Sequence, residues 1–381
     1  MTGPAMPAPA MAGAAMTGVP EVVEKFRAAG SELAKDGESD LAVAWPRIAR
    51  LGIFEPGRSS EAVAAIEGLG LGGLPAGWVY AVASQLFGIL TPLRRLLGDH
   101  QRHLLDGVES GEVLLCHAST EEGGGSDPLG ITTRADRRAD GRYLLNGRKS
   151  FITAAPLAGQ ALVFARTLPG RSPFALSAFL VPLAGAGVTR SAPLAKSALR
   201  EVPMGVLDFT DVELSPDRLV AAEGAGLSVL ATTTAWERAL LLSYALGTMR
   251  RLLDRTVDWA RTREQFGRRL GASQLAAARI ADMALRVHRS RELVYGLAAR
   301  LDAGVPMRSL TAEAAMVKVS VTEDHAALTQ SAAGLAGVRA YLEDSELFAD
   351  PATALAGLTY AGPNDLLRLT VARELGLPVG N

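Results

Sequence analysis

The sequence predicts an α+β protein in which a small antiparallel β-domain lies between two helical regions. Apolar residues recur at helical spacing in the first part of the chain, and short β-prone runs separated by turn residues follow in the middle. Long segments rich in Ala and Leu then restore helical periodicity up to the C-terminus. With 381 residues, the chain is long enough for two or three packed domains.

The N-terminal α-helical domain is expected over residues 21–112, where Val22, Val23 and Phe26 begin the helical spacing. Frequent Gly and Pro residues predict that its helices are short. Residues 1–20 are expected to form a flexible tail. Prolines interrupt each apolar stretch there and no basic segment precedes them, which argues against a signal peptide.

The β-domain is expected over residues 113–222, and the C-terminal α-helical domain over residues 223–381. The predicted strands are 143–145, 161–165, 178–181 and 206–209, and the predicted antiparallel helices are 227–261, 273–301 and 311–335. Asp140-Gly141 and Asn146-Gly147 flank the first of these strands. Both are strong turn signals because Asn, Asp and Gly tolerate positive φ, so a meander is expected.

Composition excludes several classes of function. A formal net charge of -1 leaves no general basic surface for nucleic acid. The single cysteine, Cys116, excludes an internal disulfide and follows two leucines, so it is expected to be a buried apolar residue in a reducing compartment. No run of eighteen apolar residues indicates a membrane span, and a cytoplasmic protein is expected. No metal site is predicted.

Three motifs carry chemistry. In Thr120–Asp127, three successive glycines let the backbone approach an anion closely, although a plain surface loop is an open alternative. In Asn146–Thr153, strand alternation places Phe151 and Thr153 on one face, where an aromatic ring and a hydroxyl suit a flavin; an ordinary strand with one core Phe remains the alternative.

The third motif is the arginine-rich segment 261–268, which is expected to end a helix with Gly267 as its C-cap. Arginines are favoured there by the helix dipole alone, so the segment can be purely structural. Alternatively, Arg263 and its neighbours grip the pyrophosphate of a dinucleotide, because guanidinium donors match phosphate oxygens. Gln274 offers an amide to the same ligand.

In this order and spacing, the three motifs resemble the acyl-CoA dehydrogenase family, whose pattern is T-E-P-x-x-G-S-D, then N-G-x-K-x-[WF]-I-T, then R-x-x-F-G. The resemblance continues through 208–212, 281–283 and 314–318 and covers residues 98–377. It implies the acyl-CoA dehydrogenase fold, with a four-helix bundle as C-terminal domain, and FAD as the cofactor.

The resemblance also assigns roles to single residues. Thr120 would contact the flavin ring, and Ser126, next to Gly125 in the same loop, its phosphate region. Phe151 would stack beside the isoalloxazine while Thr153 hydrogen-bonds its N5. The remaining cofactor residues would reach the adenosine half of FAD in a neighbouring subunit, which implies a homodimer or homotetramer: Arg263, Phe266, Gln274, Gln330 and Gly334.

The sequence departs from the family at the catalytic base. Family members commonly carry a Glu in a C-terminal I-Y-E-G-T segment, where this chain has Ala361. Other branches place the base on the helix after the β-domain, and Glu237 matches that position. Independently, Glu237 has no cation at helical distances of three or four residues and shares a stripe with Leu241 and Tyr244. Partial desolvation should raise its pKa, as a general base requires; a buried ion pair with a distant Arg is the alternative.

Further departures fall near the cofactor: Glu122 replaces Pro, Ala349 replaces Arg, and Pro363 replaces Thr. The leading prediction is nevertheless FAD-dependent α,β-dehydrogenation of an acyl thioester, carried by CoA or by an acyl- or peptidyl-carrier protein, with a flavoprotein or oxygen as electron acceptor. The alternatives are a flavin monooxygenase of the same fold and a non-catalytic homologue. A candidate carrier-docking patch, otherwise a solvated helix face, comprises Arg94, Arg95, Arg102 and His103.

Overall fold

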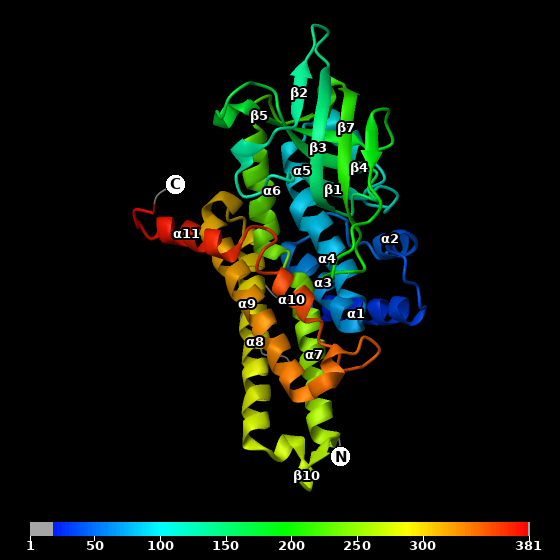
Figure 1. Ribbon diagram of the computed structural model, residues 1–381, viewed down its shortest axis with the longest axis vertical. Helices are drawn as coiled ribbons and strands as arrows, with labels where there is room; N and C mark the ends of the chain where they lie inside the picture. The colour runs from blue at the N-terminus through cyan, green and yellow to red at the C-terminus, as the bar shows by residue number, and fades with distance from the viewer. Residues whose placement is uncertain (1–17, 380–381) are drawn as a thin grey trace.

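The computed structural model describes residues 18–379 and shows a β-domain at one end of an elongated helical body (Figure 1). The predicted tail lies outside the described residues up to residue 17. The helices are α1 (Val19–Lys35), α2 (Leu41–Ala49), α3 (Ser59–Gly72), α4 (Ala76–Ala83), α5 (Thr91–Leu96), α6 (Gly226–Leu240), α7 (Ser243–Thr262), α8 (Gln274–Asp302), α9 (Thr311–Ala336), α10 (Pro351–Ala356) and α11 (Asn364–Glu374).

The strands lie mainly between α5 and α6, so the predicted order of helices, sheet and helices is confirmed. They are β1 (Leu115–Ala118), β2 (Arg134–Arg137), β3 (Tyr143–Thr153), β4 (Gln160–Arg166), β5 (Leu176–Pro182), β6 (Val188–Arg190), β7 (Met204–Leu214) and β8 (Leu219–Val220), with β9 (Glu264–Gln265) and β10 (Arg268–Arg269) in a separate hairpin. The four predicted strands are all present, as β3, β4, β5 and β7.

The main sheet is not a meander. Its order is β6-β7-β3-β2-β4-β5-β8, so β3 pairs with β2 and β7 rather than with β4. Most pairs are antiparallel, but β1 and β2 pair with β4 in parallel. The Asp140-Gly141 turn is confirmed: Gly141 has a φ of 85° and joins β2 to β3.

The expected turn at Asn146-Gly147 is wrong. Both residues lie inside β3, where the register with β7 shifts between Leu145 and Gly147. Gly147 has a φ of 146°, so the glycine allows the irregular strand pairing at this point rather than a turn. A Cβ at Gly147 would lie 2.7 Å from the Thr133 Cα, so the neighbouring backbone also requires glycine.

A single continuous helix runs from Ala76 to Leu96 through α4, the π-helical segment η2 (Ser84–Leu90) and α5. Among the described residues it is the one helix long and apolar enough to cross a membrane, but 83% of its apolar window is buried within the fold. Its hydropathy is therefore that of a core helix, which packs against α6, α7 and the sheet.

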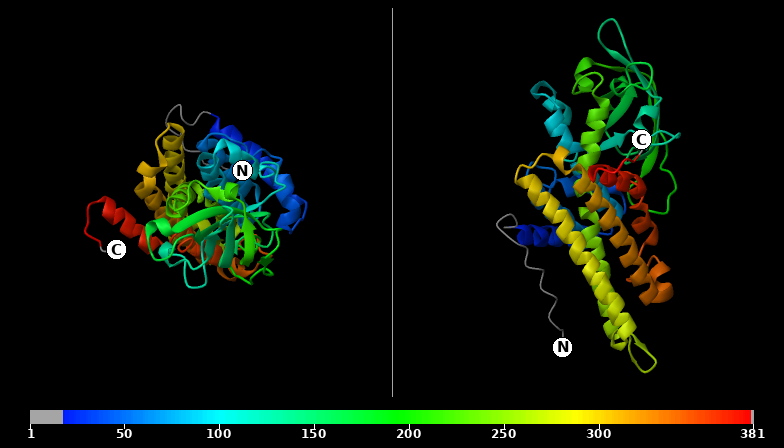
Figure 2. Two further views of the ribbon diagram at one scale, coloured as in Figure 1. Left: turned by 90° about the horizontal axis from the view of Figure 1, so that it is seen from above. Right: turned by 90° about the vertical axis from the view of Figure 1, so that its left-hand side faces the viewer.

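The C-terminal helices form a bundle of α6, α7, α8 and α9. The expected helix over 227–261 is interrupted at Leu241 and Leu242, where neither Gly nor Pro signals a break. Seen from the side, α7 and α8 extend away from the β-domain and end at the β9–β10 hairpin (Figure 2). Gly267 lies in the turn of that hairpin, with a φ of 69°, so its predicted role as a helix C-cap is wrong.

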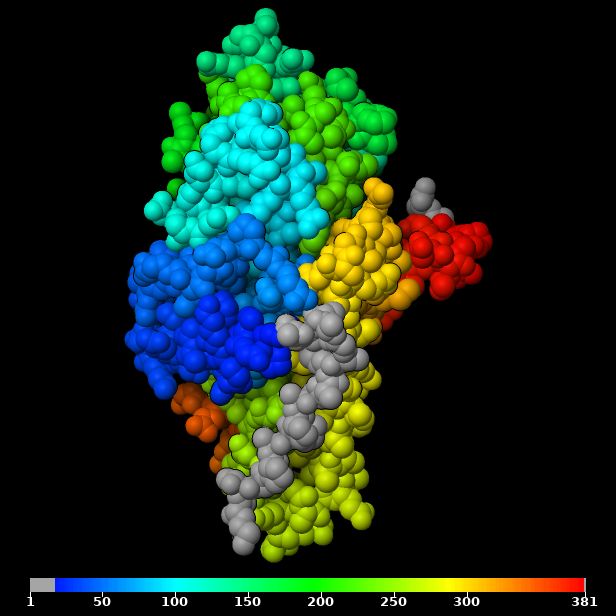
Figure 3. All heavy atoms as spheres, turned by 180° about the vertical axis from the view of Figure 1, so that it is seen from behind, coloured from blue at the N-terminus to red at the C-terminus, as the bar shows by residue number. Residues whose placement is uncertain are grey.

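The N-terminal helices pack directly on the C-terminal bundle, side by side with α8 (Figure 3). Asp302 at the end of α8 accepts hydrogen bonds from the Ser59 and Ser60 amides, at 2.6 and 3.1 Å, and so caps α3. Further along the same helices, buried Glu67 pairs with Arg291 at 2.9 Å. These contacts fix the two helical regions relative to each other.

Candidate functional site

A cavity of about 1060 Å³ lies between the β-domain and the helices. Its walls come from α4 and η2, from β1 and the glycine loop that follows it, from the end of β3, from α6, and from the segment that contains α11. Six of the residues predicted from the sequence line it: Thr120, Gly125, Ser126, Phe151, Thr153 and Glu237. The fold thus gathers positions that are spread over more than one hundred residues of sequence.

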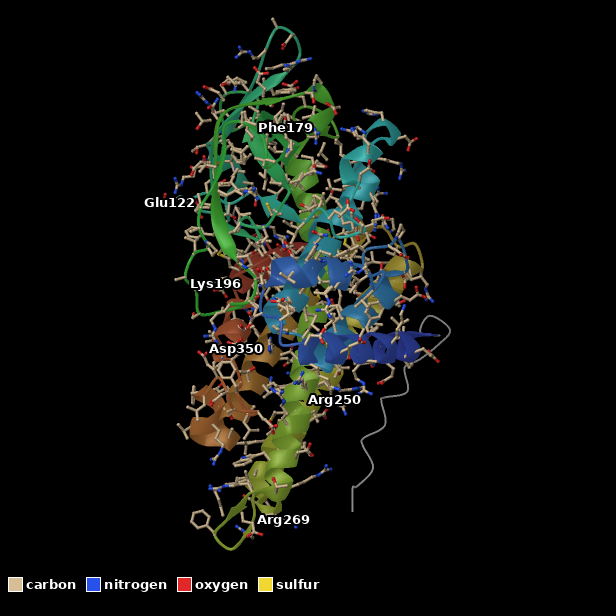
Figure 4. All side chains as sticks on the ribbon, turned by 90° about the vertical axis from the view of Figure 1, so that its right-hand side faces the viewer. Glu122, Phe179, Lys196, Arg250, Arg269 and Asp350 are labelled. Carbon is tan, nitrogen blue, oxygen red and sulfur yellow. The ribbon has the colours of Figure 1, made fainter. Side chains whose placement is uncertain are left out.

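The glycine loop is held by a buried ion pair beneath it. Lys149 donates to Glu121 at 2.9 Å, and Glu121 also accepts hydrogen bonds from Thr132 and Thr133. Burial opposes ionisation, but Lys149 and these hydrogen bonds lower the pKa of Glu121 to about 2. Glu121 is therefore a structural anion that anchors the loop, and the exposed Glu122 stands beside it on the surface (Figure 4).

The loop leaves space for a ligand on both of its sides. Gly125 and Ser126 line the main cavity and also a second one of about 520 Å³. A Cβ at Gly125 would lie 3.0 Å from the Thr120 hydroxyl, so a side chain there would crowd Thr120. Nothing lies within 4 Å of the positions where Gly123 and Gly124 would carry a Cβ. This open backbone is a suitable cradle for a phosphate group.

Phe151 and Thr153 face the cavity from the last residues of β3. Phe151 has a φ of 60° and Ala154 a φ of 62°, which is unusual for residues other than glycine. The Phe151 ring is 54% exposed, although it borders an apolar region. A strained backbone that presents an uncovered aromatic ring at a cavity is typical of a ligand-binding position.

Glu237 lines the cavity from α6. Among residues 18–379, no side chain forms an ion pair or a hydrogen bond with its carboxyl group. The η2 backbone passes beside it, because a Cβ at Gly88 would lie 3.6 Å from the Glu237 carboxyl carbon. Burial raises the pKa of Glu237 to about 7, against the opposing effect of Arg238 and Lys318. The side chain can therefore gain or lose a proton near neutral pH.

The segment between α10 and α11 closes the cavity near Glu237. Arg238 Nε donates to the Ala361 carbonyl oxygen at 2.7 Å, and Lys318 Nζ donates to the Gly362 carbonyl oxygen at 2.8 Å. Ala361 itself has a φ of 52° and offers no proton acceptor. Arg238 and Lys318 therefore lower the pKa of Glu237 and also hold this segment in place.

Comparisons with known proteins place this geometry in a family. Residues 116–212 match the model described as acyl-CoA dehydrogenase, middle domain, and residues 224–376 match acyl-CoA dehydrogenase, C-terminal domain. The chain is 34% identical over 322 residues to an L-prolyl-[peptidyl-carrier protein] dehydrogenase of Pseudomonas fluorescens, which is 84% of either protein. The chain belongs to the acyl-CoA dehydrogenase family.

Solved structures of similar proteins have the same fold as this chain. The crystal structure of the prolyl acyl carrier protein oxidase AnaB, at 26% identity, superimposes with a TM-score of 0.88 over 97% of this chain and 100% of that one. The FAD complex of PigA, at 25% identity, gives 0.89 over the same shares. The acyl-CoA dehydrogenase fold predicted from the motifs is therefore confirmed.

The other predicted cofactor residues lie away from the cavity. Arg263 and Phe266 belong to the hairpin region at the far end of α7, and Figure 4 shows Arg269 of that hairpin distant from Glu122 of the glycine loop. Phe266 is fully exposed at the tip, and Gln274 is exposed at the start of α8. Gln330 and Gly334 are exposed on α9. None of the five lines the cavity of this chain.

The candidate docking patch on and after α5 consists of side chains with local partners. Arg94 pairs with Glu109 and Arg102 with Asp99, while the Arg95 guanidinium lies 4.7 Å from the centre of the Trp236 ring. His103 is within 3.9 Å of Asp217. None of the four lines the cavity. These contacts favour the alternative of a solvated helix face.

Three cavity residues were missed from the sequence. Tyr80 and Tyr360 line the wall near Glu237, with ring centroids 5.2 Å apart. His117 faces the cavity from β1, where its Nε2 lies 3.0 Å from the Thr233 hydroxyl. Burial lowers the pKa of His117 to about 4, so it is neutral at physiological pH. Tyr80 and His117 belong to apolar runs whose pattern predicts core packing, whereas Tyr360 lies in the segment that the resemblance aligns with I-Y-E-G-T, where the family's Glu position drew the interpretation to Ala361.

Proposed function

We propose that this protein catalyses the FAD-dependent α,β-dehydrogenation of an acyl thioester, with Glu237 as the base. One observation carries the proposal: the Glu237 carboxyl group, which has no ion-pair or hydrogen-bond partner among residues 18–379 and a pKa of about 7, shares a cavity with Phe151 and Thr153. A general base works best when its pKa lies near the working pH. A structural glutamate of this burial would be expected to have an ion-pair partner.

The residues present fit FAD. The open glycine backbone supplies amides for phosphate oxygens, and the exposed Phe151 ring supplies a stacking surface beside the Thr153 hydroxyl. Thr120, Gly125, Ser126, Phe151 and Thr153 would hold the flavin half. When bound, FAD would supply the acceptor for the hydride that leaves the substrate β-carbon together with its two electrons.

Residues of the chain itself remove the second hydrogen, as a proton, from the substrate. The ionised Glu237 carboxylate takes the proton from the substrate α-carbon, forming its O–H bond as the C–H bond breaks. Arg238 and Lys318 keep part of the Glu237 population ionised in a cavity that otherwise favours the neutral acid. Because Ala361 cannot accept a proton, the base acts from α6 rather than from the segment between α10 and α11.

For the substrate, we propose a prolyl thioester on a peptidyl-carrier protein. The similarity to an L-prolyl-[peptidyl-carrier protein] dehydrogenase over 84% of the chain supports this choice over a CoA thioester. The product is then the α,β-unsaturated thioester on the same carrier. Electrons leave the reduced cofactor to a flavoprotein or to oxygen.

We further propose a homodimer or homotetramer. Arg263, Phe266, Gln274, Gln330 and Gly334 are remote from the cavity and four of them are exposed, as expected for residues that serve the cofactor of a neighbouring subunit. The fully exposed Phe266 ring at the hairpin tip supports this, because a lone aromatic ring in water gains free energy by contact with a partner.

The test is anaerobic mixing of the yellow holoenzyme with prolyl thioesters on carrier protein and on CoA. Bleaching of the flavin absorbance is expected with wild type, and none with Glu237→Gln, at unchanged FAD content. Glu24→Gln, a change of an exposed glutamate on α1 that lines neither cavity, should bleach normally.

Equal bleaching in Glu237→Gln would remove this residue from the reaction. If reduction instead required an external reductant and was followed by oxygen uptake, the monooxygenase alternative would replace the dehydrogenase. A purified protein that holds no flavin would favour the non-catalytic homologue.

A further inference from the structure

A wall of three tyrosines borders the cavity next to Glu237. Tyr80 from α4 and Tyr360 from the segment after α10 line the cavity, with their rings edge-to-face at 61°. Tyr244 from α7 is fully buried, and its ring centroid lies 5.4 Å from that of Tyr80. The wall therefore has two members that can touch a ligand and one that supports them.

Most polar groups on this side of the cavity are already engaged. The Tyr360 hydroxyl is bound to the Tyr244 hydroxyl at 2.6 Å. Arg238 Nε and Lys318 Nζ donate to the Ala361 and Gly362 carbonyl oxygens. Tyr80 lines the same cavity as Thr153 and Glu237, and the Glu237 carboxylate is close enough to raise the pKa of its phenol. Of the two tyrosines that line the cavity, Tyr80 is thus the one whose hydroxyl is not engaged in the Tyr244–Tyr360 hydrogen bond.

The Tyr80 phenol remains neutral. Burial, followed by the Glu237 carboxylate, raises its pKa well above the usual value for tyrosine. A neutral phenol has one proton to donate and two lone pairs to accept with. The Tyr80 oxygen can therefore accept a hydrogen bond from a donor on the substrate.

We infer that Tyr80 is a specificity-determining residue that accepts a hydrogen bond from the ring N–H of the acyl group, next to the carbon that Glu237 deprotonates. This inference rests on the proposed function. The nitrogen of a 2-pyrrolidinyl thioester is bonded to the α-carbon, so its recognition group must lie beside the base. Tyr80 meets that requirement, whereas an acyl group without N–H leaves the phenol oxygen unpaired in a buried place.

Binding of unreactive pantetheine amides to the holoenzyme tests the inference by calorimetry. The three ligands carry prolyl, tetrahydrofuran-2-carbonyl and cyclopentanecarbonyl groups, which have similar ring size but differ in N–H, O and CH₂ at one position. Wild type should bind the prolyl amide more tightly than the other two by roughly tenfold, the usual worth of one buried hydrogen bond.

Tyr80→Phe should reduce that preference to about twofold or less. The matched control is Tyr244→Phe, which removes a hydroxyl from the same cluster but from a residue that does not line the cavity. It should keep the preference. The wild-type ranking needs no variant, so equal binding of the three amides would exclude the inference even if Tyr80→Phe is unstable.

Equal binding of the three amides by wild type, or an undiminished prolyl preference in Tyr80→Phe, would overturn the inference. Either result is compatible with bleaching by a prolyl thioester, so the proposed function would stand. Conversely, if no thioester bleaches the flavin, the proposed function fails whichever amide binds best.

Discussion

Arg238 Nε donates to the Ala361 carbonyl oxygen at 2.7 Å, and this bond ties the helix of Glu237 to the segment that commonly carries the family's base. The segment around Ala361 therefore keeps a fixed backbone position although the family's glutamate is absent from it. Its backbone is held by the residue next to the proposed base, and Lys318 holds the following carbonyl. The helix that carries the proposed base and the segment that carries Ala361 are thus joined by hydrogen bonds.

Replacement of Arg238 by Leu should shift the pH profile of flavin bleaching to higher pH. Arg238 is the strongest of the charges that lower the pKa of Glu237, so its loss raises that pKa above about 7. The measurement is the single-turnover bleaching rate between pH 5 and 9. Arg250→Leu, a change of an arginine on α7 paired with Asp254, is the control and should leave the profile in place. A shift to lower pH would contradict the proposed electrostatics.

The stability of the protein should depend on Glu237 in a defined pH window. Its folded pKa of about 7 exceeds the usual 4.5, so the neutral acid favours the folded state and this contribution is complete below pH 4.5. It is lost as pH rises to about 7. Glu237→Gln should therefore gain, relative to wild type, on the order of 3 kcal/mol in free energy of unfolding between pH 4.5 and 8. Denaturant titrations at matched cofactor content measure this, and a constant difference would count against a buried, unpaired carboxyl.

Gly147→Ala should destabilise the β-domain strongly. The residue has a φ of 146°, and a Cβ would lie 2.6 Å from the Thr133 hydroxyl oxygen and 2.7 Å from the Thr133 Cα. Backbone strain and the clash together should cost about 3 kcal/mol. Gly123→Ala is the matched control, since nothing lies within 4 Å of its Cβ position, and its effect should stay within about 0.5 kcal/mol. Similar midpoints of thermal unfolding for both variants would refute this account of β3.

Phe266→Ala should lower FAD content without affecting the fold of the single chain. The ring is 100% exposed, so its loss removes no contact within the chain, but the family resemblance gives it to the cofactor of a neighbouring subunit. Phe174→Ala, which changes another exposed ring at 72%, is the control and should retain FAD. The flavin-to-protein absorbance ratio and the mass in solution report the result. Full retention of FAD in Phe266→Ala would argue against a role at a shared site.

Local patterns were sufficient for most of the fold. Short β-prone runs between turn residues identified β3, β4, β5 and β7, and helical periodicity identified α8 and α9 within one or two residues. The failures have a common cause. The Asn146-Gly147 signal reports only that positive φ is tolerated, and pairing with β7 decides whether the chain turns or continues. The break between α6 and α7 likewise has no local signal.

The candidate site was predictable where one motif supplied the chemistry and not where distant elements meet. The absence of a cation three or four residues from Glu237 along its helix was readable, and the structure shows no ion-pair partner for its carboxyl group within the described residues. Tyr80, Lys318 and Ala361 come from three segments separated by long stretches of sequence. Their convergence beside Glu237 depends on tertiary packing, which periodicity does not encode.

The cap of α3 by Asp302 bears on how the chain is made. Ser59 and the carboxylate that caps it are 243 positions apart, so α3 leaves the ribosome long before its capping partner exists. Until then its first amides are satisfied by water and its apolar face has no bundle to cover it. The N-terminal helices therefore reach their final stability only after Asp302 has been synthesised, and a nascent chain arrested after the β-domain should remain sensitive to protease within residues 18–100.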